Sequence, residues 1–186
     1  MSPEVIQSDR LDLVWLSPDY MEALLDGRRE EAEQIGGFVL PGDWPDEHDA
    51  RFLRYRLKQA REDATQLPWL VRAIVLREPE RPLIGHIGFH GAPGRNALKA
   101  PDAVEIGYRV FFEYRRQGYA TEAVRALLEW ARAQGVDRFV ASVGPENTPS
   151  LAIVRQLGFR EVGSHWDDED GEELEFELSA ERGPLA

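Results

Sequence analysis

The chain has 186 residues, of which 42% are apolar and 30% are charged, and its formal net charge is −12. This length suits a single domain, 1–186, with one sizeable hydrophobic core. The acidic balance argues against a nucleic-acid partner but permits a cationic one, and the absence of cysteine excludes disulfides, thiolate catalysis and cysteine-ligated metals.

The N-terminal half predicts one strand, two helices and a hairpin. Alternating apolar and polar residues indicate a strand at Arg10–Leu16. Ser17-Pro18 is typical of a helix start, and Asp46–Glu62 predicts a second helix with one apolar side. The glycine- and proline-rich stretch before Asp46 predicts a loop. Two runs at 69–76 and 83–90, separated by a proline-rich turn, predict a hairpin.

Glycines recur within the second strand of this hairpin, at Gly85 and Gly88. Their spacing is not that of a nucleotide-binding loop, so we interpret them as places of close backbone approach or bulging. His86 and His90 lie on one face of the same strand, too far apart for one metal ion, and are expected to be structural. Residues 91–100 predict a flexible loop.

The C-terminal half predicts alternating strands and helices followed by a second hairpin. The expected elements are a strand at Val104–Phe112, a helix at Thr121–Gln134, a strand at Arg138–Val143, a short helix from Thr148 to Gly158, and hairpin strands at Glu161–Trp166 and Glu172–Leu178. The acidic turn of that hairpin lacks the flanking helices and the first ligand of a calcium-binding loop, so no metal site is expected. Together the elements predict a mixed α/β fold.

The run from Tyr114 to Thr121 is the most informative stretch. A glycine-containing turn between a strand and a helix leaves several backbone N–H groups directed into one concavity, at the positive end of the helix dipole. Arg115 and Arg116 add two permanent charges beside Gly118. The run therefore predicts a site for an anion such as a diphosphate.

The pattern Arg-x-x-Gly-x-Ala at 115–120 resembles the acyl-CoA pyrophosphate loop of the GNAT superfamily of N-acetyltransferases. The upstream block 104–108 and the downstream blocks 147–150 and 156–159 resemble the branch that acetylates the N-termini of ribosomal proteins. The resemblance spans most of the chain, with its sharp motifs between Glu105 and Phe159. It implies the GNAT fold, in which a mostly antiparallel sheet with splayed central strands is flanked by helices.

The same resemblance implies acetyl-CoA as co-substrate and assigns the residues that hold it. Backbone N–H groups of the glycine turn would bind the diphosphate, the N–H of Val110 would stabilise the oxyanion, and Asn147 would bind the pantetheine arm, although asparagine is also a common turn residue. The expected cofactor-binding residues are Val110, Phe111, Arg115, Arg116, Gln117, Gly118, Tyr119, Ala120, Thr121 and Asn147.

Two catalytic candidates follow, each with a structural alternative. Many members of the superfamily use a tyrosine seven residues beyond the asparagine as the acid for the leaving thiolate; that position is Val154, which leaves Ser150 or water. Ser150 is equally a normal helix-start residue. Glu105 on the preceding strand is a candidate base for the amine, or a structural carboxylate paired with an arginine.

We therefore expect an N-acetyltransferase in which the amine attacks acetyl-CoA directly in a ternary complex. The resemblance suggests a protein N-terminal amine as acceptor. A small-molecule amine of the aminoglycoside type and a non-catalytic acyl-CoA-binding domain stay open as alternatives, as does a homodimer. No apolar run approaches a membrane span, and the first residues lack the features of a secretory signal, so a cytoplasmic location without a membrane partner is expected.

Overall fold

The computed structural model of the protein describes residues 4–167 and 171–179. The strands are β1 (Ile6–Gln7), β2 (Leu11–Trp15), β3 (Arg72–Leu76), β4 (Leu83–Phe89), β5 (Ala103–Val110), β6 (Arg138–Val143), β7 (Arg160–Asp167) and β8 (Gly171–Ser179). The α-helices are α1 (Pro18–Leu25), α2 (Arg29–Gly36), α3 (Glu47–Glu62), α4 (Tyr119–Ala133) and α5 (Thr148–Gln156), and two 3₁₀ segments are η1 (Ala64–Trp69) and η2 (Phe112–Tyr114).

The described residues form one eight-stranded sheet in the order β1-β2-β3-β4-β5-β6-β8-β7. Neighbouring strands run antiparallel, with the exception of the parallel pair β5 and β6. The C-terminal strands pair as the predicted hairpin and extend the sheet beyond β6. The expected mixed α/β architecture with a mostly antiparallel sheet is therefore confirmed.

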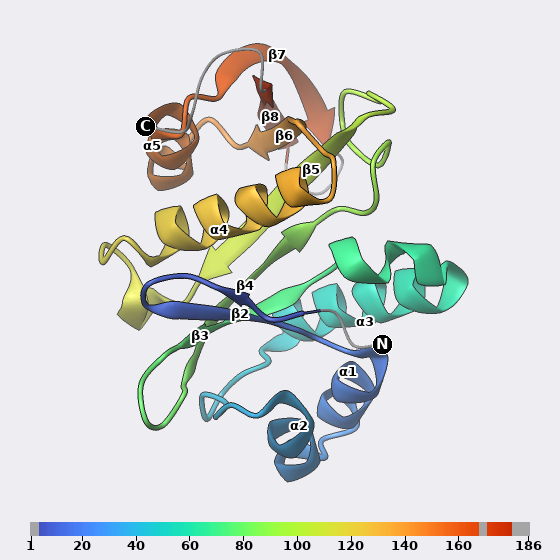
Figure 1. The fold of residues 1–186 in the computed structure, drawn as a ribbon, viewed down its shortest axis with the longest axis vertical. Coiled ribbons are helices and arrows are strands. Elements are labelled where there is room, and N and C mark those ends of the chain that lie inside the picture. The colour runs from blue at the N-terminus through green and yellow to red at the C-terminus, as the bar shows by residue number, and fades with distance from the viewer. Residues whose placement is uncertain (1–3, 168–170, 180–186) are drawn as a thin grey trace.

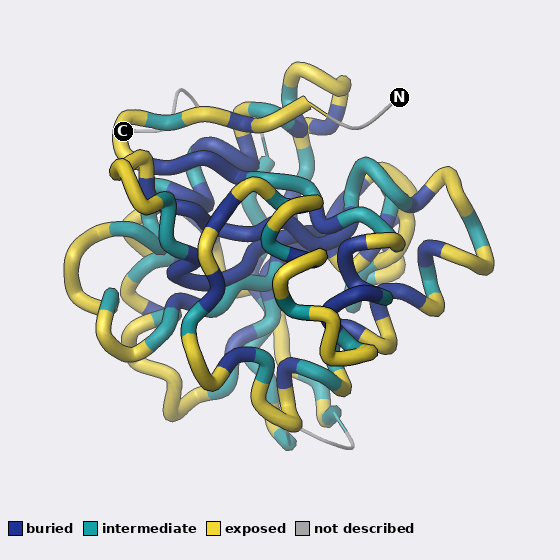
Figure 2. Tube along the Cα trace, turned by 90° about the horizontal axis from the view of Figure 1, so that it is seen from below, coloured by how far each residue is buried: buried dark blue, intermediate teal, exposed yellow. Residues whose placement is uncertain are grey.

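Helices cover both faces of the sheet (Figure 1). One face packs against α4 and α5 through a core that includes Leu13, Ile87 and Val124. The other face packs against α1, α2 and α3 through a core that includes Tyr20, Leu53 and Val75. Figure 2 shows the buried chain running through the centre of the molecule, with exposed segments around it. No described helix has both the length and the apolar character needed to span a membrane.

The structure contains a helix that the sequence analysis did not predict. Helix α2 buries only Ala32, and its first turn carries Glu30 and Glu31. Such a polar segment lacks the apolar periodicity from which a helix is recognised. The expected strand at 69–76 is shorter at its start, because residues 64–69 form η1 and β3 begins at Arg72.

The loop at 91–100 was expected to be flexible but is held by side-chain hydrogen bonds. The Asn96 amide nitrogen donates to the carbonyls of Ala100 at 2.7 Å and Ala103 at 3.0 Å, and the Asn96 amide oxygen accepts from Ala100 N–H at 2.9 Å. These bonds fold the loop back onto the start of β5. The acidic turn of the C-terminal hairpin, 168–170, lies outside the described residues.

The interpretation of Gly85 and Gly88 as places of close approach is confirmed. A Cβ added at Gly85 would lie 2.1 Å from the carbonyl oxygen of Arg109, and one at Gly88 would lie 2.8 Å from that of Leu70. In β3, opposite Gly85, the pairing with β4 also shifts register, between Ile74 and Val75. These glycines allow β4 to pack tightly in the centre of the sheet.

We expect Gly85→Ala to lower the free energy of unfolding by about 1–3 kcal/mol, because the methyl group must displace backbone rather than a side chain. Denaturant unfolding followed by circular dichroism measures this. The matched control is Gly42→Ala, since a Cβ at Gly42 meets no atom within 4 Å. Equal stability of the two variants would contradict the tight approach at Gly85.

Candidate active site

The two central strands β5 and β6 part after a short paired segment. Their parallel pairing covers Ala103–Glu105 and Arg138–Val140. Beyond this point β5 stays paired with β4 as far as Val110, and β6 stays paired with β8 as far as Val143. The second halves of β5 and β6 therefore diverge, and a split opens between them inside the sheet. The splayed central strands expected from the resemblance are present.

Backbone groups of β5 line this split. Phe111 N–H donates to the Ile84 carbonyl at 2.9 Å, so the odd-numbered residues at this end of β5 are hydrogen-bonded to β4. In a strand, successive N–H groups point to opposite sides. The N–H of Val110 therefore points to the side that β6 has left. A polar group entering the split finds an unoccupied donor there.

The turn that follows β5 forms a concave array of N–H groups. Arg116 has φ +59° and Gly118 has φ +82°, so the chain twice enters the left-handed region. The N–H groups of 116–121 make no hydrogen bond to any described acceptor, and α4 has no side-chain cap at its start. Such an array at a helix N-terminus binds anions. The anion site predicted from the sequence has the required geometry.

A cavity of about 760 Å³ extends from this turn to the split. Three arginines line it, at positions 109, 115 and 116, together with Asn147 and Ser150 from the start of α5. The described residues that line it include no carboxylate. On a chain with net charge −12, this cavity is locally positive. We refer to it as the cofactor cavity.

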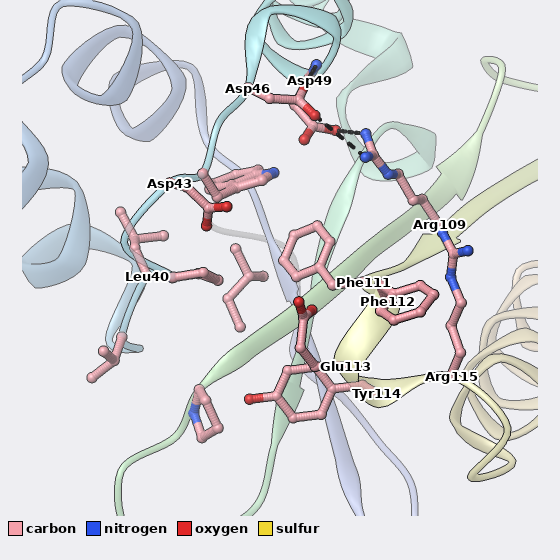
Figure 3. A pocket seen from close by; sticks show the side chains of 15 residues that line it. Leu40, Asp43, Asp46, Asp49, Arg109, Phe111, Phe112, Glu113, Tyr114 and Arg115 are labelled. Atoms are coloured by element: carbon pink, nitrogen blue, oxygen red, sulfur yellow. Dashed lines mark hydrogen bonds and ion pairs between the residues drawn. The ribbon is translucent and has the colours of Figure 1, made fainter.

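A second cavity, of about 440 Å³, adjoins the first. It is lined by the loop before α3, the end of β5 and η2, and its acidic residues are Asp43, Asp46, Asp49 and Glu113 (Figure 3). Aromatic side chains, among them Trp44 and Phe111, form its apolar walls. Both cavities are lined by Arg109, Phe112, Tyr114 and Arg115. We refer to the second one as the acidic cavity.

The four carboxylates of the acidic cavity differ in what they already bind. Arg109 contacts Asp49 at 2.7 Å and Asp46 at 3.4 Å, and Figure 3 shows both carboxylates directed at its guanidinium. Buried Asp49 also lies 3.4 Å from His86 Nε2. Asp43 and Glu113 have no side-chain partner among the described residues and lie on opposite sides of the cavity (Figure 3). These two carboxylates are available to a ligand.

The cofactor cavity brings together most of the residues predicted to bind the cofactor. It is lined by Val110, Arg115, Arg116, Gly118, Tyr119, Ala120, Thr121 and Asn147. Two predicted residues do not line it: Phe111 lines the acidic cavity, and Gln117 uses its amide to donate to the Glu113 carbonyl at 3.3 Å. The guanidinium of Arg115 turns back to the Val110 carbonyl at 3.0 Å, which fixes the end of β5.

Asn147 combines the two roles that the sequence left open. Its side-chain oxygen caps α5 by accepting from Ser150 N–H at 3.2 Å. Its amide nitrogen has no acceptor among the described residues and lies at the wall of the cofactor cavity. Capping therefore does not prevent Asn147 from donating to a ligand. The Ser150 hydroxyl lines the same cavity.

Glu105, the predicted base, lines neither cavity. It is 3% exposed, and its carboxylate accepts from Ala97 N–H and Ser142 Oγ, each at 2.7 Å, with His90 Nδ1 at 3.5 Å. Burial alone would raise the pKa of Glu105, but His90, Ser142 and the Ala97 N–H together hold it below its ordinary value. The arrangement favours the structural alternative, with histidine and serine in place of the expected arginine.

The sequence analysis missed several cavity residues, among them Asp43, Tyr108 and Glu113. Asp43 stands in a segment that the sequence marks only as a loop, and Glu113 lies between the strand and the glycine turn. Neither residue belongs to the Arg-x-x-Gly-x-Ala motif at 115–120, and its distance from that motif along the chain follows no known pattern. Tyr108 alternates with Val110 on one face of β5, but nothing in the sequence shows that this face opens into a cavity at that point.

Comparison with known proteins defines the family. The family model described as an acetyltransferase (GNAT) domain matches residues 10–160. Among curated relatives, the N-acetyltransferase YnaD of Bacillus subtilis is 35% identical over 48% of this chain and 49% of its own length. YjdG of the same organism is 24% identical over 83% of this chain and 89% of its own. The chain thus spans about half the length of YnaD, and both relatives are named as uncharacterised. The chain belongs to the GNAT acetyltransferase family.

Solved structures share the fold. A provisionally named ribosomal-protein-serine acetyltransferase from Vibrio cholerae has a TM-score of 0.65 at 21% identity, covering 96% of this chain and 99% of that one. The ribosomal L7/L12 α-N-protein acetyltransferase RimL, solved with coenzyme A, has a TM-score of 0.61 at 18% identity over 95% and 98%. The microcin C7 self-immunity acetyltransferase MccE, solved with acetyl-CoA and AMP, has a TM-score of 0.61 at 17% identity over 92% and 93%.

We expect Glu105→Gln to lower the free energy of unfolding at neutral pH by about 1–3 kcal/mol, because buried donors lose a charged acceptor. The lowered pKa of Glu105 sets the pH window. Its contribution is complete above the unfolded-state pKa of 4.5 and is lost as the pH falls through the folded-state value. Denaturant unfolding across this range should show the difference between wild type and variant shrinking in acid.

Enzyme turnover distinguishes this role from base catalysis. A structural Glu105 leaves the pH dependence of kcat unchanged in Glu105→Gln. If Glu105 accepted the substrate proton, kcat would fall by about 10²-fold or more even where the variant is folded, and the structural assignment would be wrong.

Proposed function

We propose that the chain transfers the acetyl group of acetyl-CoA to a primary amine by direct attack within a ternary complex. One observation carries this proposal: two adjoining cavities of opposite charge meet at the end of β5. The positive one suits a polyanionic cofactor, and the acidic one suits a substrate that arrives as an ammonium ion. The residues shared by both cavities mark where the two reactants would meet.

The residues present fit coenzyme A. Unpaired N–H groups of 116–121 would hold the diphosphate, with Arg116 adding charge at the rim. The Asn147 amide and the backbone of β5 in the split would bind the amide groups of the pantetheine arm. RimL and MccE, which share the fold, were solved with coenzyme A and with acetyl-CoA. When bound, the cofactor supplies the activated acetyl thioester.

The chain's own groups provide what acetyl transfer requires. Val110 N–H would stabilise the negative charge that develops on the thioester oxygen. Asp43 and Glu113 would attract the ammonium ion, which must lose a proton before its nitrogen can attack. Attack forms the C–N bond, the C–S bond breaks, and the thiolate leaves with a proton. No side chain need form a covalent intermediate.

A protein N-terminal amine is our first candidate acceptor. Support comes from the sequence motifs and from fold neighbours whose names state acetylation of ribosomal proteins. The acidic cavity can hold one N-terminal residue, with its ammonium group between Asp43 and Glu113 and its side chain against Trp44 and Phe111. A small cationic amine is the second candidate, since the acidic cavity offers two carboxylates and aromatic walls to such a molecule, and MccE is named for self-immunity to a microcin.

We expect Gly118→Val to abolish acetyl-CoA binding in isothermal titration, because a branched side chain at φ +82° would distort the turn that carries the anion-binding N–H groups and would crowd the Arg10 guanidinium, 3.4 Å from the added Cβ. The matched control is Gly135→Val, at φ +86° just beyond the other end of α4. This control carries the same backbone strain but lies away from both cavities. Equal affinity of the two variants would remove the glycine turn from the cofactor site.

The wild type tests the proposal itself. Binding of acetyl-CoA with release of free thiol in the presence of basic peptides or small amines supports it, and the preferred amine decides between the two acceptor candidates. Binding without turnover of any amine would favour the acyl-CoA-binding alternative. Failure of the wild type to bind acetyl-CoA would overturn the function as a whole.

We expect the double variant Asp43→Asn, Glu113→Gln to raise the KM for a cationic amine about 3- to 10-fold, because two exposed carboxylates no longer attract its charge. The affinity for acetyl-CoA should stay unchanged. Steady-state kinetics at low and high salt measures this, with the effect shrinking at high salt. The control is Asp19→Asn, which removes a carboxylate from the first turn of α1, outside both cavities. A KM that changes equally in the control would contradict the assignment.

A further inference from the structure

Tyr108 lies in the split between β5 and β6. Its side chain shares the α4 face of β5 with Val110, and both residues line the cofactor cavity together with Ser150. Residues two apart on a strand are separated by roughly 6–7 Å. A thioester positioned beside Val110 N–H would therefore lie within reach of the Tyr108 phenol.

The phenol oxygen of Tyr108 is buried and makes no hydrogen bond of normal geometry to a described residue. Tyr20 Oη is also buried without a partner, so this feature alone distinguishes nothing. Tyr108 differs because it lines a cavity, whereas Tyr20 lines neither of the two. The Tyr108 oxygen itself is not solvent-accessible in this structure, so a ligand in the cofactor cavity would contact it after a rotation of the side chain.

The surroundings keep this hydroxyl protonated. Burial raises the pKa of the Tyr108 phenol, and the nearby Ser150 side chain opposes that rise only in part. A group with a raised pKa stays a hydrogen-bond donor at neutral pH. Ser150 is the one described side chain that lowers the pKa of Tyr108, and both side chains line the cavity.

Helix α5 offers no other acid at this place. Val154 is 2% exposed and packs in the core, while its neighbour Ile153 faces the cavity. A larger side chain at 154 would enter the core instead of the cavity. Three of the described tyrosines line the cavity, at positions 108, 114 and 119. Tyr108 is the one that lies on β5, one of the two strands that form the split.

We propose that Tyr108 donates the proton taken up by the leaving thiolate, with Ser150 orienting the phenol. This inference rests on the proposed acetyl transfer. As the C–S bond breaks, the electron pair stays on sulfur, which takes the phenol proton to give the free thiol. The phenolate regains a proton lost by the attacking nitrogen, carried by water through the open cavity. The net reaction converts an ammonium ion and a thioester into an amide, a thiol and one released proton.

Tyr108→Phe should lower kcat by about 100-fold, the low end for loss of a general acid. The affinity for acetyl-CoA and the KM for the amine should stay within about threefold, because the substitution removes one oxygen atom. The matched control is Tyr20→Phe, which deletes an equally buried phenol oxygen outside the cavities and should retain wild-type kcat. Ser150→Ala should lower kcat less than Tyr108→Phe, since it removes the orienting group alone.

These assays test the role of Tyr108 separately from the proposed acetyl transfer. If the wild type binds acetyl-CoA and acetylates an amine while Tyr108→Phe retains its kcat, the role of Tyr108 is refuted and the function stands. If Ser150→Ala loses most of the rate and Tyr108→Phe little, Ser150 is the acid and the assignment is refuted. If the wild type shows no turnover, the function itself fails.

A fluorinated tyrosine at position 108 gives a readout that a structural role would not change. Fluorination lowers the pKa of the phenol but keeps its shape. A proton donor must be protonated to act, so kcat should fall at a lower pH than in the wild type. An alkaline profile identical to that of the wild type would contradict proton donation.

Discussion

The parting of β5 from β6 is the constraint on which the site depends. Each strand keeps its outer partner, β4 or β8, so the divergence leaves the inner backbone groups of both strands without hydrogen bonds to each other. Unpaired backbone groups inside a protein are costly unless a ligand or water satisfies them. Glu105 stands at the last paired position, and its carboxylate connects Ser142 on β6 to Ala97 in the preceding loop. Glu105 therefore stabilises the place where β5 and β6 part, although it lines neither cavity.

Charge separation over a short distance is the second organising feature. The chain is strongly acidic as a whole, yet the cavity at the start of α4 contains arginines and no carboxylate among its described lining residues. Arg109 lies at the boundary, where its ion pairs with Asp46 and Asp49 neutralise two of the four acids on the other side. Asp43 and Glu113 are left to act on a cationic ligand. An anionic ligand in the cofactor cavity and a cationic ligand in the acidic cavity would therefore meet at this boundary.

The sequence predicted the local parts of this arrangement and not the distant ones. The glycine turn could be recognised because one short segment supplies its donors and because Gly118 at positive φ requires glycine. The period-two alternation of a strand is also a local property, and it accounts for Tyr108 and Val110 lying on one face of β5. The acidic cavity could not be predicted, because Asp43 and Glu113 meet only through the packing of the loop before α3 against η2. The partners of Glu105 likewise come from three separate segments.

The same limit explains why the sequence analysis looked for the proton donor on α5 and did not consider Tyr108. The family resemblance defines positions only along the chain. The positions that it gives for the acid, Val154 and Ser150, both lie on α5. In the folded protein Val154 of α5 packs into the core, and Tyr108 of β5 lines the same cavity as Ser150. A strand and a helix both line the cavity, and each carries a hydroxyl, Tyr108 on β5 and Ser150 on α5. The proposed proton donation therefore depends on the split between the strands as well as on a position in α5.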